Sequence, residues 1–388
     1  MTQVLLRDVC SQAREQIRPG ERTDLKYVGL ESVEADTGGF VVGVLSKTPE
    51  DPRAVSFHFD TRHVLYGKLR PYLNKVIAPD FEGKCSTELI PLLPGESLDR
   101  QYLAYFLRRK ATVDAIVART AGARMPRADM NHLLGLSIPL PTLPEQRRIV
   151  DLLSRAEGIV RLRLEAQRKA AELVPALFRE MFGDPASNPK GWPVRRIDEL
   201  VERFEGGKNV QAGDDESATY RILKISAVTS GRYIESESKP APNDLVPAES
   251  HFIRTGDLLI SRANTEALVG ATAIVEITDG RALLPDKIWR FVWRGDATIE
   301  PRFALHLLQQ PAMRSKLSRL ASGTGGSMKN ISQAKLKTLE LPVPPVELQR
   351  EFAAKAGAVR GIAAQQTAAL ATAQATFDAL LHQSFAGS

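Results

Sequence analysis

The strongest constraint on the fold is an internal repeat with a period of about 200 residues. Residues 99–111 align without gaps on residues 300–312, a spacing of 201, and residues 125–149 align on residues 328–352, a spacing of 203. Chance does not keep a register over such a length. We therefore predict that the chain contains two copies of one globular unit.

A proline-rich segment closes each copy and leads into a long stretch rich in alanine and leucine. The two segments match Pro139 with Pro342 and Gln146 with Gln349. Prolines stop the preceding element and set the start of a helix. We therefore expect the order globular unit, helix, globular unit, helix.

In both stretches mostly apolar residues recur at alternating steps of three and four, which is the heptad pattern of coiled coils. The pattern is weaker in the second stretch. A long amphipathic helix cannot bury such a stripe alone, so each helix is expected to pair with the other. The residues predicted to pair the helices are Ile149, Leu152, Ile159, Arg163, Phe352, Val359, Ile362 and Gln366.

Polar residues favour an antiparallel arrangement of these helices. Arg163 and Gln366 hold equivalent positions near the middle of their helices, and antiparallel packing would join them in a polar layer that sets the register. The alternative, that Arg163 extends to solvent, is left open. Pro175 is expected to kink or end the first helix before Leu177, because proline inside a helix costs roughly 3 kcal/mol.

The predicted class is α+β, with two similar mixed α/β domains joined by two long antiparallel helices and related by a pseudo-two-fold duplication. The predicted boundaries are 1–142 and 184–345 for the domains, and 143–183 and 346–388 for the helices. Strands are expected within residues 251–262, 270–277 and 287–293, and single amphipathic helices of about 20 residues within 101–119 and 302–321.

Composition narrows the function classes. Of 388 residues 43% are hydrophobic, which suits a folded protein, and no stretch is long and apolar enough to span a membrane or resembles a signal peptide. We expect a cytoplasmic protein whose two cysteines, Cys10 and Cys85, are buried and inert. The six histidines are scattered without metal-ligand spacing, so neither a metal site nor a catalytic constellation is predicted.

Charge points to a polyanionic partner. The net charge is +6, and basic residues gather in two blocks, seven against one acid over residues 100–127 and seven against none over residues 302–337. Each block could make several phosphate contacts, so the pattern favours a protein that touches nucleic acid twice. A solvated helix face is the alternative for either block.

Candidate DNA contacts come from residue type and local sequence. Arginine and asparagine match the guanine and adenine edges in the major groove, and lysine suits phosphates. A surface salt bridge remains the alternative for each residue taken singly. The candidates are Lys68, Arg70, Lys75, Arg124 and Arg127 in the first half, and Arg262, Asn264, Lys287, Ser327, Lys329 and Asn330 in the second.

The repeated proline segments, PTLPEQRRIVDLL and PPVELQREFAAKA, together with GWPVRRIDELV, YGKLRPYL and EMFGDP, resemble the specificity subunit of type I restriction–modification systems. The resemblance covers almost the whole chain. It implies that each half is a target recognition domain for one part of a split double-stranded DNA sequence, and that the paired helices dock methyltransferase subunits.

The resemblance also implies a subunit without catalytic activity or cofactor of its own. Methyltransferase subunits, two in our expectation, would carry S-adenosylmethionine, and restriction and translocase subunits could join. A helix of about 38 residues spans roughly 57 Å, so the helices would act as a ruler between the half-sites. The alternatives are a coiled-coil assembly scaffold that binds DNA without sequence preference, and an unrecognised DNA-modifying enzyme.

Overall fold

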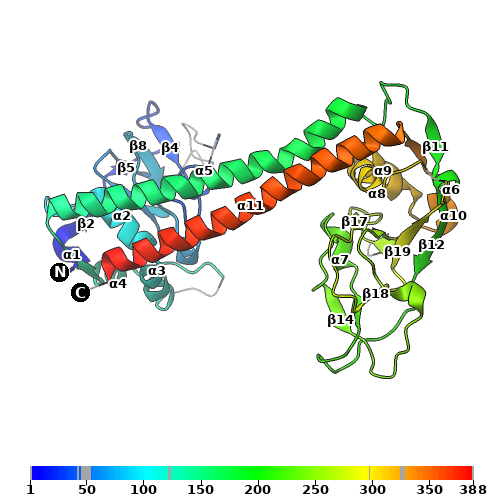
Figure 1. Cartoon of the computed structure of the whole chain (residues 1–388). Coiled ribbons are helices and arrows are strands. Elements are labelled where there is room, and N and C mark those ends of the chain that lie inside the picture. The colour runs from blue at the N-terminus through cyan, green and yellow to red at the C-terminus, as the bar shows by residue number, and fades with distance from the viewer. Residues whose placement is uncertain are drawn as a thin grey trace. The chain divides into compact units, whose positions relative to one another are not determined.

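The structure is a computed structural model that describes residues 2–41, 43–44, 54–120, 124–296, 298–323 and 328–386. The chain divides into two compact units. Unit 1 comprises Met1–Glu165 and Thr367–Ser388, and unit 2 comprises Ala166–Gln366. Both chain ends, marked N and C in Figure 1, therefore belong to unit 1.

Unit 1 contains two four-stranded sheets, ordered β2-β9-β6-β7 and β3-β5-β8-β4, and the pair β1-β10. All of its strand pairs are antiparallel except β4 with β8. Its elements before the long helix are β1 Gln3–Leu5, α1 Leu6–Val9, β2 Cys10–Gln12, β3 Gln16–Ile17, β4 Lys26–Val28, η1 Leu30–Ser32, β5 Ser56–Phe59, β6 Val64–Gly67, η2 Pro71–Leu73, β7 Val76–Ile77, β8 Gly83–Ser86, β9 Leu89–Pro94, α2 Arg100–Arg108, α3 Lys110–Val117, α4 Met130–Leu134 and β10 Ser137–Pro139.

Unit 2 contains a four-stranded sheet ordered β12-β19-β15-β17, a three-stranded sheet ordered β14-β13-β18, and the pairs β11-β21 and β16-β20. Only β13 with β18 is parallel among these strand pairs. Its elements between the long helices are β11 Val194–Arg196, α6 Ile197–Leu200, β12 Val201–Gly206, β13 Arg221–Leu223, α7 Ser226–Thr229, β14 Ser238–Pro240, η3 Glu249–His251, β15 Leu258–Ser261, β16 Ala263–Asn264, β17 Thr272–Ile274, β18 Ala282–Leu283, β19 Ile288–Trp293, α8 Pro301–Gln309, α9 Pro311–Leu320, β20 Lys329–Asn330, α10 Gln333–Lys337 and β21 Glu340–Pro342.

The two units share one architecture. Strand order β2-β9-β6-β7 in unit 1 corresponds to β12-β19-β15-β17 in unit 2, and each unit adds a second sheet with one parallel pair. The strands expected within residues 251–262, 270–277 and 287–293 form as β15, β17 and β19. The predicted mixed α and β duplication is confirmed, because the repeat in sequence is also a repeat in topology.

Two helices of 40 residues each, α5 (Leu143–Phe182) and α11 (Val346–Phe385), contribute to both units. In unit 1 the start of α5, at Ile149, and the end of α11, at Phe385, share one core. In unit 2 the end of α5, at Phe178, and the start of α11, at Phe352, share another. Opposite ends meet in each unit, which confirms the antiparallel arrangement.

Pro175 was expected to kink or end the first helix, and the end before Leu177 is wrong, while the kink stays a prediction. The helix α5 continues through Pro175 to Phe182. Beyond the proline, Phe178 packs against Phe182, Phe303 and Phe352 with ring centroids 5.0 to 5.8 Å apart. Burial of these rings offsets the local cost of the proline, because aromatic side chains contribute more packing than any other type.

A glutamine fastens each unit to its long helix. In unit 1 the buried Gln146 accepts a hydrogen bond from the Asp99 amide (2.8 Å) and donates to the carbonyls of Ser97 and Pro141 (2.9 Å each). The repeat partner Gln349 makes the same three bonds at equivalent positions in unit 2, at 2.7 to 2.9 Å. The repeated proline segment therefore encodes a joint between a domain and its helix.

The predicted pairing face of the helices needs correction. Ile149 and Phe352 are buried as expected, but Leu152, Ile159 and Ile362 are 40%, 53% and 49% exposed. Leu153 is fully buried in place of Leu152. The start of α5 packs on the domain helix α2 as well as on α11, so its buried stripe is broader than a coiled-coil seam and turned by about one residue.

Each expected domain helix of about 20 residues is divided in two. The backbone is extended at Arg109, between α2 and α3, and at Gln310, between α8 and α9. Gln310 precedes Pro311, which disfavours helical backbone at the residue before it. At the equivalent Arg109, the guanidinium donates to the Phe385 carbonyl (3.1 Å) and lies over two rings.

The polar layer expected between the long helices would join Arg163, which belongs to unit 1, to Gln366, which belongs to unit 2. This layer stays a prediction.

Candidate nucleic-acid interface

In unit 1 the end of strand β6 meets the segment that precedes helix α4. The Lys68 amide donates to the Glu88 carbonyl (2.9 Å), and the Lys68 carbonyl accepts from the Ala128 amide (2.8 Å). A β-bridge joins Leu69 to Arg127. Candidate residues of the first half that are far apart in the sequence therefore lie on one surface.

Unit 2 builds the same framework from the equivalent segments. The Arg262 amide donates to the Lys287 carbonyl (3.0 Å), and the Arg262 carbonyl accepts from the Ile331 amide (2.8 Å). Strand β16 then pairs with β20, Asn264 opposite Lys329. The structure thus places most of the candidate residues in two corresponding positions, one in each unit. We name these the unit 1 surface and the unit 2 surface.

The unit 1 surface is a cluster of cations around one acid. The Glu88 carboxylate forms an ion pair with Arg127 (3.0 Å) and lies 3.9 Å from the Lys68 ammonium. Arg70 is exposed beside them, and its backbone is left-handed (φ 52°) while its amide donates to the Pro126 carbonyl (2.7 Å). This geometry turns the Arg70 residue out of the strand direction at the point where the two segments meet.

Two further candidates of unit 1 differ in their roles. Arg124 is exposed on the segment that leads to Arg127. Lys75 instead turns inward, because its ammonium donates to the Leu30 carbonyl (2.7 Å), and burial lowers its pKa. The predicted DNA contact by Lys75 is therefore corrected to a structural contact within the domain.

The unit 2 surface centres on Arg262. Its guanidinium donates to the Asp286 carbonyl (2.6 Å), lies 3.4 Å from the Asp286 carboxylate and stacks over the Trp289 ring at 5.6 Å. Lys287 follows in the same turn. The guanidinium is thus held on three sides, which orients its donor groups before any ligand arrives.

The remaining candidates of unit 2 line the β16-β20 pair. The Asn264 carboxamide oxygen accepts from the Thr265 amide (2.8 Å), and the Lys329 ammonium donates to the Gly323 carbonyl (3.2 Å). Asn330 bridges to Ser322 through its backbone. Ser327 lies outside the described residues.

The sequence reasoning missed Glu88 and Asp286, the acids that hold these cations. Glu88 lies in the turn that leads into β9, and Asp286 lies in the turn that leads into β19. Both strands are inner strands of a four-stranded sheet. The repeat does not indicate this pair of acids, because the backbone bonds of Lys68 and Arg262 make Glu88 equivalent to Lys287 and not to Asp286.

Three of the seven cations in the first basic block are structural, whereas Arg124 and Arg127 lie at the unit 1 surface. Arg108 is buried and pairs with Glu157 of α5, and Arg109 donates to the Phe385 carbonyl. Arg100 donates to the Thr61 and Pro79 carbonyls. These three guanidinium groups stabilise the domain core, so neither phosphate binding nor a solvated face describes them.

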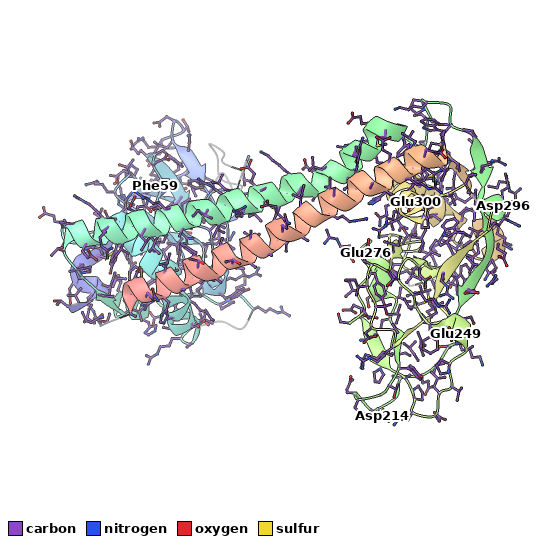
Figure 2. The ribbon with its side chains drawn as sticks, in the orientation of Figure 1. Phe59, Asp214, Glu249, Glu276, Asp296 and Glu300 are labelled. Atoms are coloured by element: carbon purple, nitrogen blue, oxygen red, sulfur yellow. The ribbon has the colours of Figure 1, made fainter. Side chains whose placement is uncertain are left out.

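The second basic block is also partly structural. Arg302 forms an ion pair with Glu276 (2.9 Å), which Figure 2 labels, and Arg314 donates to the Ala267 and Val269 carbonyls. Lys329 is the member of this block that reaches the unit 2 surface. The number of basic residues along the chain therefore overestimates how many are available to bind phosphate, because arginine also donates hydrogen bonds to buried carbonyls.

Metal ligands and thiols are not gathered into a site among the described residues. Among them, no cluster of three or more histidine, cysteine or acidic residues could hold a metal ion. Both cysteines are buried, and burial raises the pKa of Cys10 to about 12. No helix in the described ranges is both long and apolar enough to cross a bilayer.

Comparison with known families gives one clear match. The family described as "Type I restriction modification DNA specificity domain" matches residues 70–172 and 189–355, one segment in each half of the repeat. The two matched segments include Arg70, Arg124 and Arg127 of the unit 1 surface and all of the candidates of the unit 2 surface.

Among curated proteins, the chain is similar to the type I restriction enzyme EcoEI specificity subunit of Escherichia coli, with 29% identity over 53% of this chain and 35% of the relative. It is also similar to the MjaVIII specificity subunit of Methanocaldococcus jannaschii, with 24% identity over 66% of this chain and 62% of the relative. The alignments thus span about a third and about three fifths of these relatives.

Solved structures share the fold. One, from a study of complex assembly and conformational transition of the type I R-M system, has a TM-score of 0.61 and 22% identity, over 100% of this chain and 97% of the other. The S subunit of a type I restriction–modification system from M. genitalium has a TM-score of 0.59 and 14% identity, over 100% and 96%.

Proposed function

This chain belongs to the family of type I restriction–modification DNA specificity domains, and we propose that it is the subunit that reads a bipartite DNA target for such a system. Each unit reads one half of the target through its own surface. The chain itself carries out no chemical step. It directs partner subunits to the sequence that it binds.

The observation that carries this proposal is the pair of corresponding surfaces with different side chains. Lys68, Arg70 and Arg127 of unit 1 correspond in the framework to Arg262, Asn264 and Asn330 of unit 2. Arginine matches guanine and asparagine matches adenine in the major groove, while lysine suits phosphates. One framework with two side-chain sets suits a reader of two different half-sites.

The exposed apolar residues of α5 support a role in assembly. Leu152, Ile159 and Leu162 are spaced by seven and three residues and are 40%, 53% and 64% exposed. A helical partner surface could cover such a stripe. We propose that methyltransferase subunits, two per chain, dock along α5 and α11 and carry S-adenosylmethionine, and that restriction and translocase subunits join this complex.

A domain exchange tests the proposal. Replacing residues 1–142 by the corresponding domain of another family member, then selecting bound sequences from a random DNA pool, is expected to change one half of the target only. A change in both halves would contradict the two-reader arrangement. Binding without any sequence preference at moderate salt would favour the scaffold alternative instead.

A further inference from the structure

Beside the unit 2 surface, the same domain holds a hollow of about 220 Å³. It adjoins the turn that carries Asp286 and Lys287, so it is continuous with the segment that positions Arg262. Nothing in the proposed reading of bases uses it. Its polar lining consists of Lys208, Asn209, Lys224, Lys239, Asp286 and Lys287.

The walls of the hollow are held firmly. A Cβ on Gly207 would lie 1.6 Å from the Leu284 carbonyl oxygen, so only glycine lets the two backbones approach this closely. The Gly207 amide donates to the Pro285 carbonyl (3.0 Å). The Lys239 ammonium donates to the Val210 carbonyl (2.7 Å) from the other side. The segment that carries Lys208 is thus fixed against both neighbours.

Positive charge dominates this hollow. Four of the lining residues are lysines, and the one lining acid, Asp286, lies 3.4 Å from the Arg262 guanidinium. Lys208 and Lys224 are exposed, and Lys287 is half-buried. A lysine ammonium acts as a compact point charge that binds phosphate without reading sequence.

We propose that this hollow binds a phosphodiester group of the DNA backbone next to the half-site read by unit 2. Lys208, Lys224 and Lys287 contact the phosphate, and Lys239 acts as a positioning residue through its bond to Val210. The inference rests on the proposed function, because continuity with the Arg262 segment is what favours a DNA phosphate over a free phosphate.

The test uses the full-length chain and a duplex that carries its selected target, with a non-target duplex beside it. Lys208→Gln, Lys224→Gln and the double variant are titrated over a salt series. Each single variant is expected to lower the salt slope by part of one phosphate contact. The double variant is expected to lower the slope by about 0.9 and to weaken binding to both duplexes by roughly tenfold at physiological salt. The selected sequence is expected to stay unchanged.

Lys355→Gln is the matched control. Lys355 lies on α11, pairs with Glu351 and is half exposed, and it does not line the hollow. The variant removes the same charge and is expected to keep the DNA affinity and the salt slope of the wild-type chain. An equal loss from this control would show a general charge effect and would overturn the inference.

Neutral methylphosphonate linkages locate the contact. Each linkage of the target is replaced in turn. Replacement at one or two linkages beside the second half-site is expected to weaken DNA binding by the wild-type chain and to leave DNA binding by the double variant unchanged. Unchanged affinity and slope in the lysine variants would overturn the inference. Saturable binding of inorganic phosphate at these lysines, without a methylphosphonate effect, would also overturn it, in favour of a free-anion site. A wild-type chain without sequence preference would instead count against the proposed function.

Discussion

At the scale of single residues, the acids of the two surfaces are the informative side chains. Glu88 holds Arg127 and Lys68, and Asp286 holds Arg262, so each acid reduces the charge that its surface offers to phosphate. A carboxylate can also accept a hydrogen bond from cytosine, which gives it a part in selecting bases.

We predict that Glu88→Gln strengthens binding to non-target DNA severalfold and relaxes the sequence preference of the first half-site only, because it releases two cations. Asp286→Asn is the matched variant for the second half-site. Binding selection and salt titrations on the two variants measure both effects. A change in the half-site read by the other unit would refute the prediction.

A second residue-scale prediction concerns His306 on α8. Burial, together with the positive charges of Arg360 and Arg302, lowers the pKa of His306 to about 4, and its Nε2 lies 3.4 Å from the Arg360 guanidinium. The unfolded chain takes up this proton near pH 6.5 while the folded chain stays neutral. Stability is therefore lost as the pH falls from 6.5 towards 4, by on the order of 2 to 3 kcal/mol.

His306→Gln is expected to remove this part of the pH dependence, because glutamine can accept from Arg360 but does not titrate. Urea unfolding of both chains at pH 7 and pH 4.5 gives the difference. Equal losses of stability in the two chains would show that His306 does not titrate in this way.

At the scale of elements, the joint made by each glutamine decides how a domain meets its helix. Gln146→Met and Gln349→Met keep the side-chain volume but leave one amide and two carbonyls without their partner. Each variant is expected to lose about 2 to 4 kcal/mol of unfolding free energy in its own unit.

The tryptophans allow the two joints to be separated. All three, Trp192, Trp289 and Trp293, belong to unit 2. Gln349→Met is therefore expected to shift the unfolding transition that tryptophan fluorescence follows. Gln146→Met is expected to shift the transition that circular dichroism follows more than the transition that fluorescence follows. An unshifted fluorescence transition in Gln349→Met would contradict the role of the joint.

Element boundaries were partly predictable. The proline segments marked the starts of α5 and α11, because proline at a helix entry is a local signal. The break at Gln310 follows from Pro311, but the equivalent break at Arg109 has no such residue and depends on contacts with Phe385. Pro175 was a local signal that aromatic packing overrode.

At the scale of the whole molecule, the length of the two long helices is expected to set the gap between half-sites. Inserting one heptad into each helix, after residue 165 and after residue 366, keeps the helical faces nearly aligned. It should lengthen the gap by about 10 Å, about three base pairs, with both half-sites unchanged.

A two-residue insertion at the same places is the control, because it turns the helical faces by roughly 200° and is expected to abolish selective binding. Selection from a pool of split targets with varied gaps reads out both variants. An unchanged gap in the heptad variant would rule out the ruler.

The sequence by itself determined the duplication, the antiparallel order of the helices and the residues at which α5 and α11 begin, because each depends on a local signal or on a repeated register. The tertiary structure decided which face of α5 is buried, that Arg108 and Lys75 serve the domain interior, and that Glu88 and Asp286 stand among the candidate cations. These outcomes depend on contacts between residues that are distant in the sequence, and neither composition nor periodicity indicates such contacts.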